Sequence, residues 1–134
     1  MTGTGPVVLV TGGRDYTDKL AVAVALGRIA PAVVVQGGAR GADQFAREWA
    51  LAAGGSWLVE VPARWGDHGR SAGPQRNAWM LDLALRLVAR PADLIVLAFP
   101  GGRGTENMVA LAMKVGADVR RVTDPPPPPP RRAP

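Results

Sequence analysis

The chain has 134 residues, of which 47% are hydrophobic and 20% charged, a balance typical of one soluble globular domain. It contains no cysteine and one histidine, which excludes disulfides, thiol catalysis and cysteine zinc sites, argues against a histidine-rich metal centre and fits a reducing cytoplasm. The net charge of +5 suits nucleic-acid binding, but the arginines are scattered and no basic run has interleaved aromatics, so nucleic acid is not expected as the main ligand.

Strand-like runs rich in Val, Ile and Leu alternate with helical patterns along the chain. Strands are expected near residues 7–10, 32–36, 57–61, 93–99 and 118–122, and helices near 17–29, 42–53, 74–89 and 105–115. Five apolar strands separated by four helices predict a three-layer α/β domain over residues 1–123 with a mainly parallel sheet. Right-handed crossovers and a doubly wound plan give the expected strand order 3-2-1-4-5.

Local signals predict the ends and the apolar faces of the first two helices. Thr17 or Asp18 can cap the first helix. Its expected apolar face consists of Leu20, Val24 and Ala25. In the second helix, apolar residues recur at helical spacing before the glycine pair at 54–55, namely Phe45, Trp49 and Ala52.

The third helix has the broadest apolar face. Pro74 suits its first turn, and Pro91 is expected to end it. The apolar face comprises Met80, Leu81, Ala84, Leu85 and Val88. Trp49, Trp57 and Trp79 lie in apolar segments and are expected in the core or at an interface.

The end of the chain differs in composition from the rest. A proline run, Pro125–Pro130, follows Asp124 and precedes Arg131 and Arg132. Such a run cannot continue a strand or a helix and favours an extended polyproline conformation. Residues 124–134 are therefore expected to form a disordered, solvated tail, with docking on an aromatic groove of a partner as the alternative.

Three of the strand-like runs end in a glycine pair that is closely followed by an arginine. A glycine turn between a strand and a helix exposes backbone N–H groups, and a helix N-terminus attracts anions. Neighbouring guanidinium groups recognise phosphate or carboxylate, so these loops predict a site for an anionic small molecule. Neither the P-loop pattern nor G-x-G-x-x-G is present. The predicted binding residues are Gly12, Gly13 and Arg14; Gly37, Gly38 and Arg40; and Gly101, Gly102, Arg103, Gly104 and Thr105.

Side chains near these loops extend the candidate site. Arg76 and Asn77, at the start of the third helix, are expected to contact the ligand. Trp65 lies in a long polar connection, where it can stack on a base or pack over the loop. Asp15 and Asp43 each follow a glycine loop and can bind ribose hydroxyls, act as a base or cap a helix.

The segment Pro100–Thr105, PGGRGT, resembles the PGGxGT signature of the SLOG superfamily. That superfamily includes the LOG-type nucleoside-monophosphate phosphoribohydrolases and the DprA/Smf DNA-processing proteins. The closer resemblance is to its small YspA-like branch. It covers nearly the whole chain before the tail, through residues 12–15, 37–43, 63–65, 72–77 with Met80, and 100–105. The resemblance implies a Rossmann-like fold with a pocket for a nucleotide or a nucleotide-derived ligand, which Arg76 helps to bind.

One position departs from the enzymes of the superfamily. LOG-type hydrolases carry PGGxGTxxE, in which the glutamate assists cleavage of the N-glycosidic bond, and here Met108 stands in its place. Glu106 is close in sequence, but two residues along a helix turn a side chain by about 200°. Glu106 is then an acidic first-turn residue favoured by the helix dipole. Whether the protein is an enzyme stays open, with Asp15, Asp43 and Glu106 as the candidate catalytic residues.

The expected function is binding or sensing of a phosphate-containing nucleotide or a nucleotide-derived ligand, with no cofactor and no metal. The first alternative is a hydrolase that breaks an N-glycosidic or phosphate bond, and the second is DNA binding by analogy with DprA. The apolar helix faces are compatible with a homo-oligomer. No stretch approaches the roughly 20 apolar residues of a membrane span, and the first residues lack a signal-peptide pattern, so a cytoplasmic protein is expected.

Overall fold

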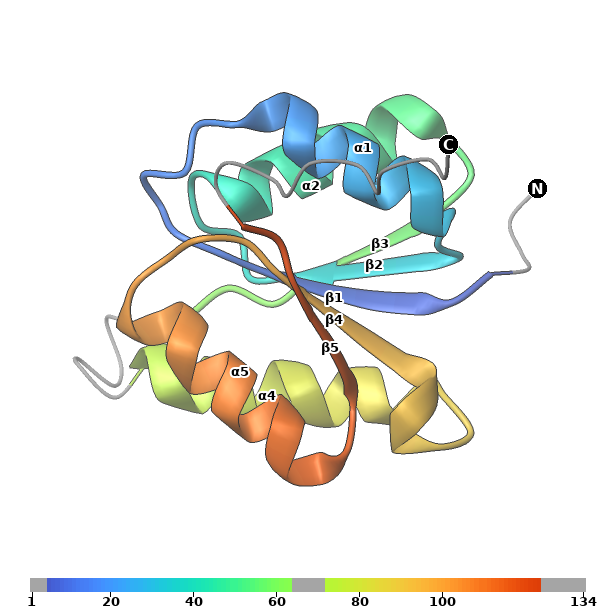
Figure 1. Cartoon of the computed structure of the whole chain (residues 1–134). Coiled ribbons are helices and arrows are strands. Elements are labelled where there is room, and N and C mark those ends of the chain that lie inside the picture. The colour runs from blue at the N-terminus through green and yellow to red at the C-terminus, as the bar shows by residue number, and fades with distance from the viewer. Residues whose placement is uncertain (1–4, 64–71, 124–134) are drawn as a thin grey trace, which may run out of the picture.

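A parallel sheet of five strands forms the middle layer of the structure (Figure 1). The computed structural model describes residues 5–63 and 72–123. Its strands are β1 (Val7–Thr11), β2 (Val33–Gln36), β3 (Trp57–Glu60), β4 (Leu94–Ala98) and β5 (Asp118–Arg121). They lie in the order β3-β2-β1-β4-β5, and every neighbouring pair is parallel. The predicted α/β fold class and the predicted strand order are both confirmed.

Helices cover both faces of this sheet. The helices α1 (Lys19–Ile29) and α2 (Ala42–Ala53) lie on one face, and α4 (Ala72–Arg86) and α5 (Arg103–Val115) lie on the other (Figure 1). A short 3-10 helix, η2 (Pro91–Asp93), leads into β4. None of the helices in residues 5–63 and 72–123 is long and apolar enough to cross a membrane.

The two-residue period of the strands divides the core into two layers. Along β1, Val8 and Val10 pack toward α1 and α2, whereas Val7 and Leu9 pack toward α4 and α5. The central strands β1 and β4 are buried along their whole length, whereas the edge strands β3 and β5 are only partly covered. The near-continuous apolar runs in the sequence arise because helices cover both faces of the central strands.

The apolar face predicted for the third helix is confirmed. In α4, Met80, Leu81 and Ala84 are buried, and Leu85 packs against the same core layer, as does Val88 just after the helix. Pro74 lies in the first turn, as expected. The predicted role of Pro91 is wrong, because α4 already ends at Arg86 and Pro91 instead opens the 3-10 helix.

The apolar face predicted for the first helix is wrong. Leu20 and Val24 are 72% and 42% exposed, and the buried residues of α1 are Val22 and Leu26. Ala25 does pack against the core, on the same side as these two residues. A helix rich in apolar residues on several sides gives no decisive sequence pattern, and the sheet beneath it selects the buried side.

Two of the tryptophans lie on the surface rather than in the core. Trp57 is 64% exposed on the edge strand β3, and Trp79 is 48% exposed on α4, whereas Trp49 is partly buried and packs against the core between α1 and α2. Trp57 lies on β3, an edge strand of the described sheet. The core expectation therefore fails for Trp57 and Trp79.

Replacing Asp18 by alanine is expected to lower the free energy of unfolding by about 1 kcal/mol. Asp18 is the N-cap of α1, and its carboxylate accepts a hydrogen bond from the Ala21 N–H at 3.0 Å. Urea unfolding of Thr17→Ala supplies the control, because Thr17, the other cap candidate, lies outside the helix and should change the stability by less than about 0.5 kcal/mol. An equal loss in both variants would contradict the assignment of the cap.

Candidate functional site

A cleft opens at the carboxyl ends of β1 and β4, where the topology of the sheet reverses. The chain leaves β1 toward α1 on one face and leaves β4 toward α5 on the other, so the two loops diverge at this point. The cleft has a volume of ≈ 660 Å³, within the range of small-molecule sites. It is lined by residues 11–14, 39, 43, 73–74, 76–77, 80, 102–105 and 107.

The loops after β1 and β4 touch through their glycines. The N–H of Gly13 donates a hydrogen bond to the Pro100 carbonyl at 2.9 Å. A methyl group built on Gly13 would lie 3.0 Å from the Cα of Gly101, and one on Gly12 would lie 3.0 Å from the Cβ of Phe99. These glycines are thus required by close packing, and the N–H of Gly13 already has a protein partner.

In the loop after β2, side chains of the protein accept the hydrogen bonds of the backbone N–H groups. The Oδ2 atom of Asp43 accepts hydrogen bonds from the N–H groups of Gly37, at 3.2 Å, and Ala39, at 3.3 Å. The N–H of Gly38 donates to the side-chain oxygen of Gln36. The amides of Gly37 and Gly38, which the sequence suggested for phosphate, are therefore occupied by internal acceptors.

The N-terminus of α5 differs, because its first turn lines the cleft and it has no side-chain cap. The N-cap, Gly102, makes no side-chain cap hydrogen bond. The first backbone bond of the helix runs from the Glu106 N–H to the Gly102 carbonyl at 3.1 Å. The three preceding amides, of Arg103, Gly104 and Thr105, have no partner within the helix, and all three residues line the cleft. The positive end of the α5 dipole is thus turned toward the cleft.

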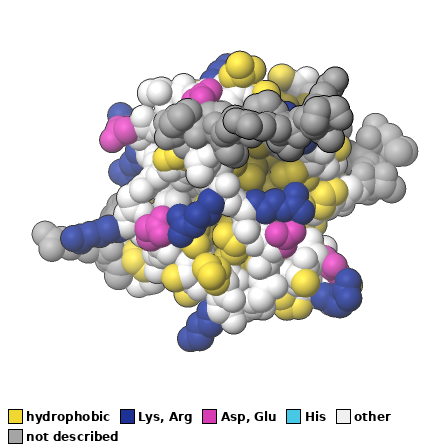
Figure 2. Space-filling view, in the orientation of Figure 1, with side chains coloured by type: hydrophobic (Ala, Val, Ile, Leu, Met, Phe, Trp, Pro, Cys, Tyr) yellow, Lys and Arg dark blue, Asp and Glu magenta, His cyan; other side chains and the backbone are white. Residues whose placement is uncertain are grey.

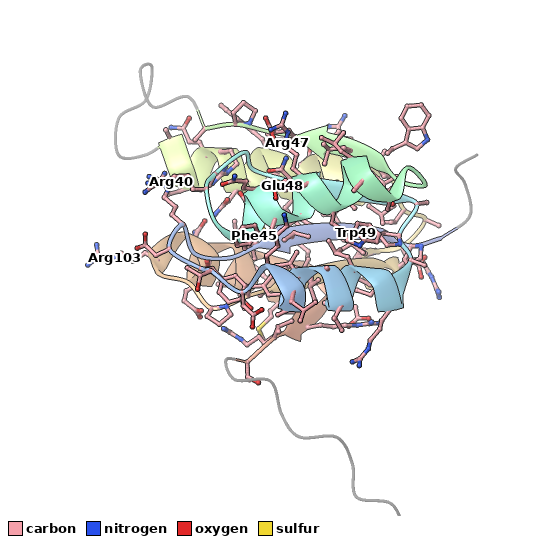
Figure 3. The ribbon with its side chains drawn as sticks, turned by 90° about the horizontal axis from the view of Figure 1, so that it is seen from above. Arg40, Phe45, Arg47, Glu48, Trp49 and Arg103 are labelled. Carbon is pink, nitrogen blue, oxygen red and sulfur yellow. The ribbon has the colours of Figure 1, made fainter. Side chains whose placement is uncertain are left out.

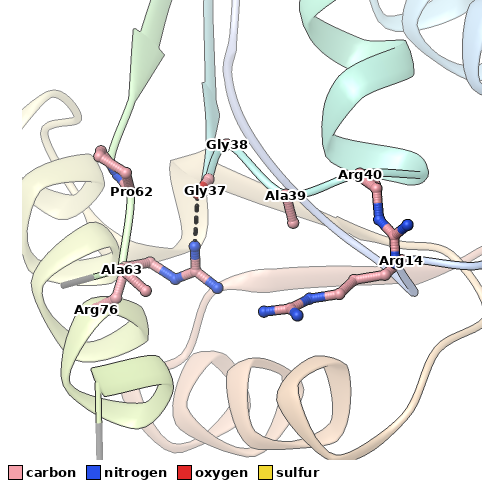
Figure 4. A pocket seen from close by; sticks show the side chains of 8 residues that line it. All are labelled: Arg14, Gly37, Gly38, Ala39, Arg40, Pro62, Ala63 and Arg76. Carbon is pink, nitrogen blue, oxygen red and sulfur yellow. Dashed lines mark hydrogen bonds between the residues drawn. The ribbon is translucent and has the colours of Figure 1, made fainter. Parts of the chain in front are cut away.

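Arg76 forms a partly buried wall between the cleft and the loop after β2. Its Nη1 atom donates to the carbonyl of Gly37 at 2.7 Å and to that of Val61 at 3.5 Å. Arg14 reaches toward it from the loop after β1 (Figure 4). Burial lowers the pKa of Arg76 below its ordinary value, the charge of Asp43 raises it, and the charge of Arg14 lowers it.

Asn77 connects Arg76 to the N-terminal turns of α5 by hydrogen bonds. Its Nδ2 atom donates to the Gly104 carbonyl and to the Oδ1 atom of Asn107, both at 3.0 Å, and its Oδ1 atom accepts from Nε of Arg76 at 3.0 Å. These bonds use the polar atoms of Asn77, which is 3% exposed. Asn77 is thus a positioning residue that joins Arg76 to the first turn of α5.

The three carboxylates expected as catalytic candidates are separated. Asp43 lines the cleft, whereas the exposed Asp15 lines a different hollow beside Tyr16 and Pro100. Glu106 is bound by Arg121 through hydrogen bonds of 2.8 and 2.9 Å, which hold the pKa of Glu106 below its ordinary value. The structure therefore brings Asp43 alone of the three into contact with the cleft.

The ion pair between Glu106 and Arg121 lies beside the edge strand β5. Arg121 lies on β5, next to a second exposed pair between Arg120 and Asp118 at 2.9 Å. On the face seen in Figure 2, basic side chains lie apart from one another, some of them beside acidic ones, rather than in one continuous patch. Exposed pairs of this kind contribute little to stability.

Burial dominates the electrostatics of Asp43. The side chain is 5% exposed, and this burial raises its pKa from 3.8 to about 6. The hydrogen bond from Ala39, the charge of Arg76 and the hydrogen bond from Gly37 all lower the pKa, but by less than burial raises it. Asp43 can therefore exchange a proton at pH values close to neutral.

The remaining predicted residues lie in different surroundings. Arg40 and Arg103 are exposed at the same end of the molecule (Figure 3), and Thr105 is buried at the edge of the cleft. Met108 is fully buried in the core layer beneath α4 and α5, so its position holds an apolar side chain. Trp65 lies outside the residues that the structure describes.

Three polar residues at or beside the site were not predicted from the sequence. Asn107 lines the cleft and accepts from Asn77, but a lone asparagine inside a helical pattern carries no signal. Gln36 is fully buried, and its Nε2 atom donates to Oε1 of Glu60 at 2.6 Å. The sequence does carry a signal for the Gln36–Glu60 pair: each of these polar residues ends an apolar strand. In the sheet the two strands are neighbours and the two residues are in register.

An open parallel sheet with a basic cleft at its switch point defines a class of ligand-binding α/β domains. Residues 6–68 match the model of the YspA, cpYpsA-related SLOG family. The chain is also similar to the Gene 61 protein of Mycobacterium phage D29, with 38% identity over 123 residues that cover 84% of this chain and 92% of the phage protein. The chain belongs to the YspA, cpYpsA-related SLOG family, which confirms the resemblance noted in its sequence.

Replacing Asp43 by asparagine is expected to flatten the pH dependence of stability. Because its pKa is raised on folding, native Asp43 keeps a proton that the unfolded chain releases, so wild-type stability falls as the pH rises from about 4 to above 6. The carboxamide oxygen of the variant can still accept from Gly37 and Ala39. The difference between the two proteins in urea unfolding should change by up to about 3 kcal/mol over this interval.

The control is Asp82→Asn, which removes an exposed carboxylate that pairs with Arg86 on the surface of α4. Its stability should follow that of the wild type to within about 0.5 kcal/mol at each pH. Parallel curves for the wild type and Asp43→Asn would contradict the raised pKa of Asp43.

Proposed function

We propose that this protein binds a phosphate-containing nucleotide or a nucleotide-derived ligand in the cleft between β1 and β4. The observation that carries the proposal is the N-terminus of α5, which has no side-chain cap and whose first residues line a cleft bordered by arginines. Backbone amides at a helix N-terminus bind a phosphate through several hydrogen bonds and through the helix dipole. Membership of the SLOG family supports a nucleotide-related ligand.

Arginines on two sides balance the charge of the phosphate. Arg103 extends from the first turn of α5, and Arg14 and Arg76 border the cleft from the loop after β1 and from α4. Guanidinium groups form paired hydrogen bonds with phosphate oxygens, which are stronger than bonds between neutral groups. In this arrangement the glycines 12, 13 and 101 act by letting the two loops approach, and α5 supplies the amides.

The rest of the cleft suits the nucleoside part of the ligand. Pro74 and Met80 line it with apolar atoms, against which a base can pack. Asp43 is the buried carboxyl of the lining and can accept a hydrogen bond from a ribose hydroxyl. A cleft of ≈ 660 Å³ is large enough for a whole mononucleotide.

The absence of a LOG-type glutamate from the described part of the cleft favours binding without turnover. The relevant positions are 108, where the LOG-type glutamate would stand, and 106, where the nearby glutamate lies. Position 108 holds a methionine that is fully buried in the core, and Glu106 is held by Arg121 on the surface. Neither side chain presents a carboxylate to the cleft.

Hydrolysis of the bound nucleotide is the second candidate function, and the raised pKa of Asp43 is the observation that favours it. A carboxyl with a pKa of about 6 can take a proton from water and return it to a leaving group close to neutral pH. Asp43 would then activate water for attack on an N-glycosidic or phosphate bond. Chromatography of incubated mixtures separates binding from turnover, because cleavage of an N-glycosidic bond releases free base and ribose phosphate, and cleavage of a phosphate bond releases nucleoside and phosphate.

Adenosine monophosphate is expected to raise the melting temperature of the wild-type protein, and Arg103→Ala to weaken its binding about tenfold. Arg103 is exposed, so its loss removes a phosphate contact without disturbing the core. Arg28→Ala is the matched control, because Arg28 lies in the last turn of α1, at the opposite end of the strands from the cleft. Titration calorimetry with the three proteins measures the difference.

Two results would contradict the proposal. The first is the absence of stabilisation by adenosine monophosphate, ADP-ribose, NAD and cyclic nucleotides, each at saturating concentration. The second is equal weakening of binding in Arg103→Ala and Arg28→Ala, which would indicate a general effect of net charge rather than a contact in the cleft.

A further inference from the structure

A second, smaller pocket adjoins the cleft on the far side of Arg14 and Arg76 (Figure 4). It has a volume of ≈ 310 Å³ and lies between the loop after β2 and the segment that follows β3. Arg14, Ala39 and Arg76 line both hollows. Arg40 lines the smaller pocket and not the cleft, whereas Arg103 lines the cleft and not the smaller pocket.

Three arginines line this pocket. Arg14 and Arg76 extend toward one another from opposite sides, and the side chain of Arg40, from the loop before α2, lies beside Arg14 (Figure 4). None of the described residues that line the pocket is acidic. Like charges gathered in a partly buried hollow repel one another, and a bound anion removes that repulsion. Burial lowers the pKa of Arg76, the charge of Asp43 behind the loop raises it, and the charge of Arg14 lowers it, so Arg14 and Arg76 lie close enough to repel one another.

Side chains rather than backbone must recognise an anion in this pocket. The amides of Gly37 and Ala39 donate to Asp43, and that of Gly38 donates to Gln36. Guanidinium groups form planar, paired hydrogen bonds, and their natural partner is a terminal phosphate that offers several oxygens. The pocket thus differs from the α5 N-terminus in the way it would bind phosphate.

We propose that the smaller pocket binds a second phosphate group of the ligand in the cleft. The ligand would then be a nucleotide that carries two phosphate groups at different positions, a nucleoside bisphosphate. This inference rests on the proposed function, since it takes the first phosphate to lie at the N-terminus of α5. The two hollows meet at Arg14 and Arg76, so the linking ribose lies beside these two side chains.

Two isomeric ligands separate this proposal from recognition of any nucleotide that carries two phosphate groups. ADP and adenosine 3′,5′-bisphosphate contain the same atoms and two phosphates each, but in ADP the phosphates are contiguous. Titration calorimetry of the full chain with both ligands, and with adenosine monophosphate, is expected to show the bisphosphate binding about tenfold or more tightly than either of the others.

The arginine variants assign the gain to the smaller pocket. Arg40→Ala should remove the advantage of the bisphosphate and leave the affinity for adenosine monophosphate unchanged, whereas Arg103→Ala should weaken all three ligands. Arg47→Ala is the control for lost charge, because Arg47 lies further along α2 and does not line the pocket. Thermal unfolding without ligand verifies that each variant is folded.

The outcomes distinguish this inference from the function on which it rests. Equal affinities for ADP and the bisphosphate, tighter binding of ADP, or an Arg40→Ala variant that keeps the advantage would overturn the second phosphate site. In each of these cases adenosine monophosphate still binds and the proposed function stands. Failure of all three nucleotides to bind would overturn both.

Discussion

The close contact between the loops after β1 and β4 is the constraint on which the rest of the site depends. These strands are neighbours that lead to helices on opposite faces of the sheet. The loops can touch only where side chains are absent, and the hydrogen bond from Gly13 to Pro100 joins them. Because the second loop is held in this way, α5 starts at the switch point and its first turn, which has no side-chain cap, lines the cleft.

A buried carboxylate organises the other side of the site. Asp43 binds the amides of the loop after β2, in the manner that a bound anion would, and so closes that loop without a ligand. The same carboxylate attracts Arg76, which is fixed by the carbonyl of Gly37 and by Asn77. The raised pKa of Asp43 shows that these contacts do not fully offset its desolvation. A charged group has thus been retained in the wall of the cleft at a cost in stability.

Much of the fold and part of the site were predictable from local pattern. The apolar strand runs, the helical spacings and the rule of right-handed crossovers led to the observed strand order. The same order brought the glycine loops to one edge of the sheet. Local pattern failed for the buried side of α1 and for the surface tryptophans, because burial depends on which layer covers a residue. It also left out Gln36, Glu60 and Asn107, whose partners lie far along the chain.

Residue order alone was enough to predict a parallel α/β sheet with arginine-bearing glycine loops at one edge and a methionine at position 108. Which of these groups can meet a ligand depends on how the chain packs. Whether an amide is open depends on its acceptor. Asp43 accepts from the amides of Gly37 and Ala39, whereas the N-terminus of α5 lines the cleft and has no side-chain cap. Whether a carboxylate can act depends on its neighbours, and Arg121 holds Glu106 at the surface whereas Asp43 is buried in the wall. Hydrogen-bond partners and burial are properties of the packed chain, and residue identity does not specify them.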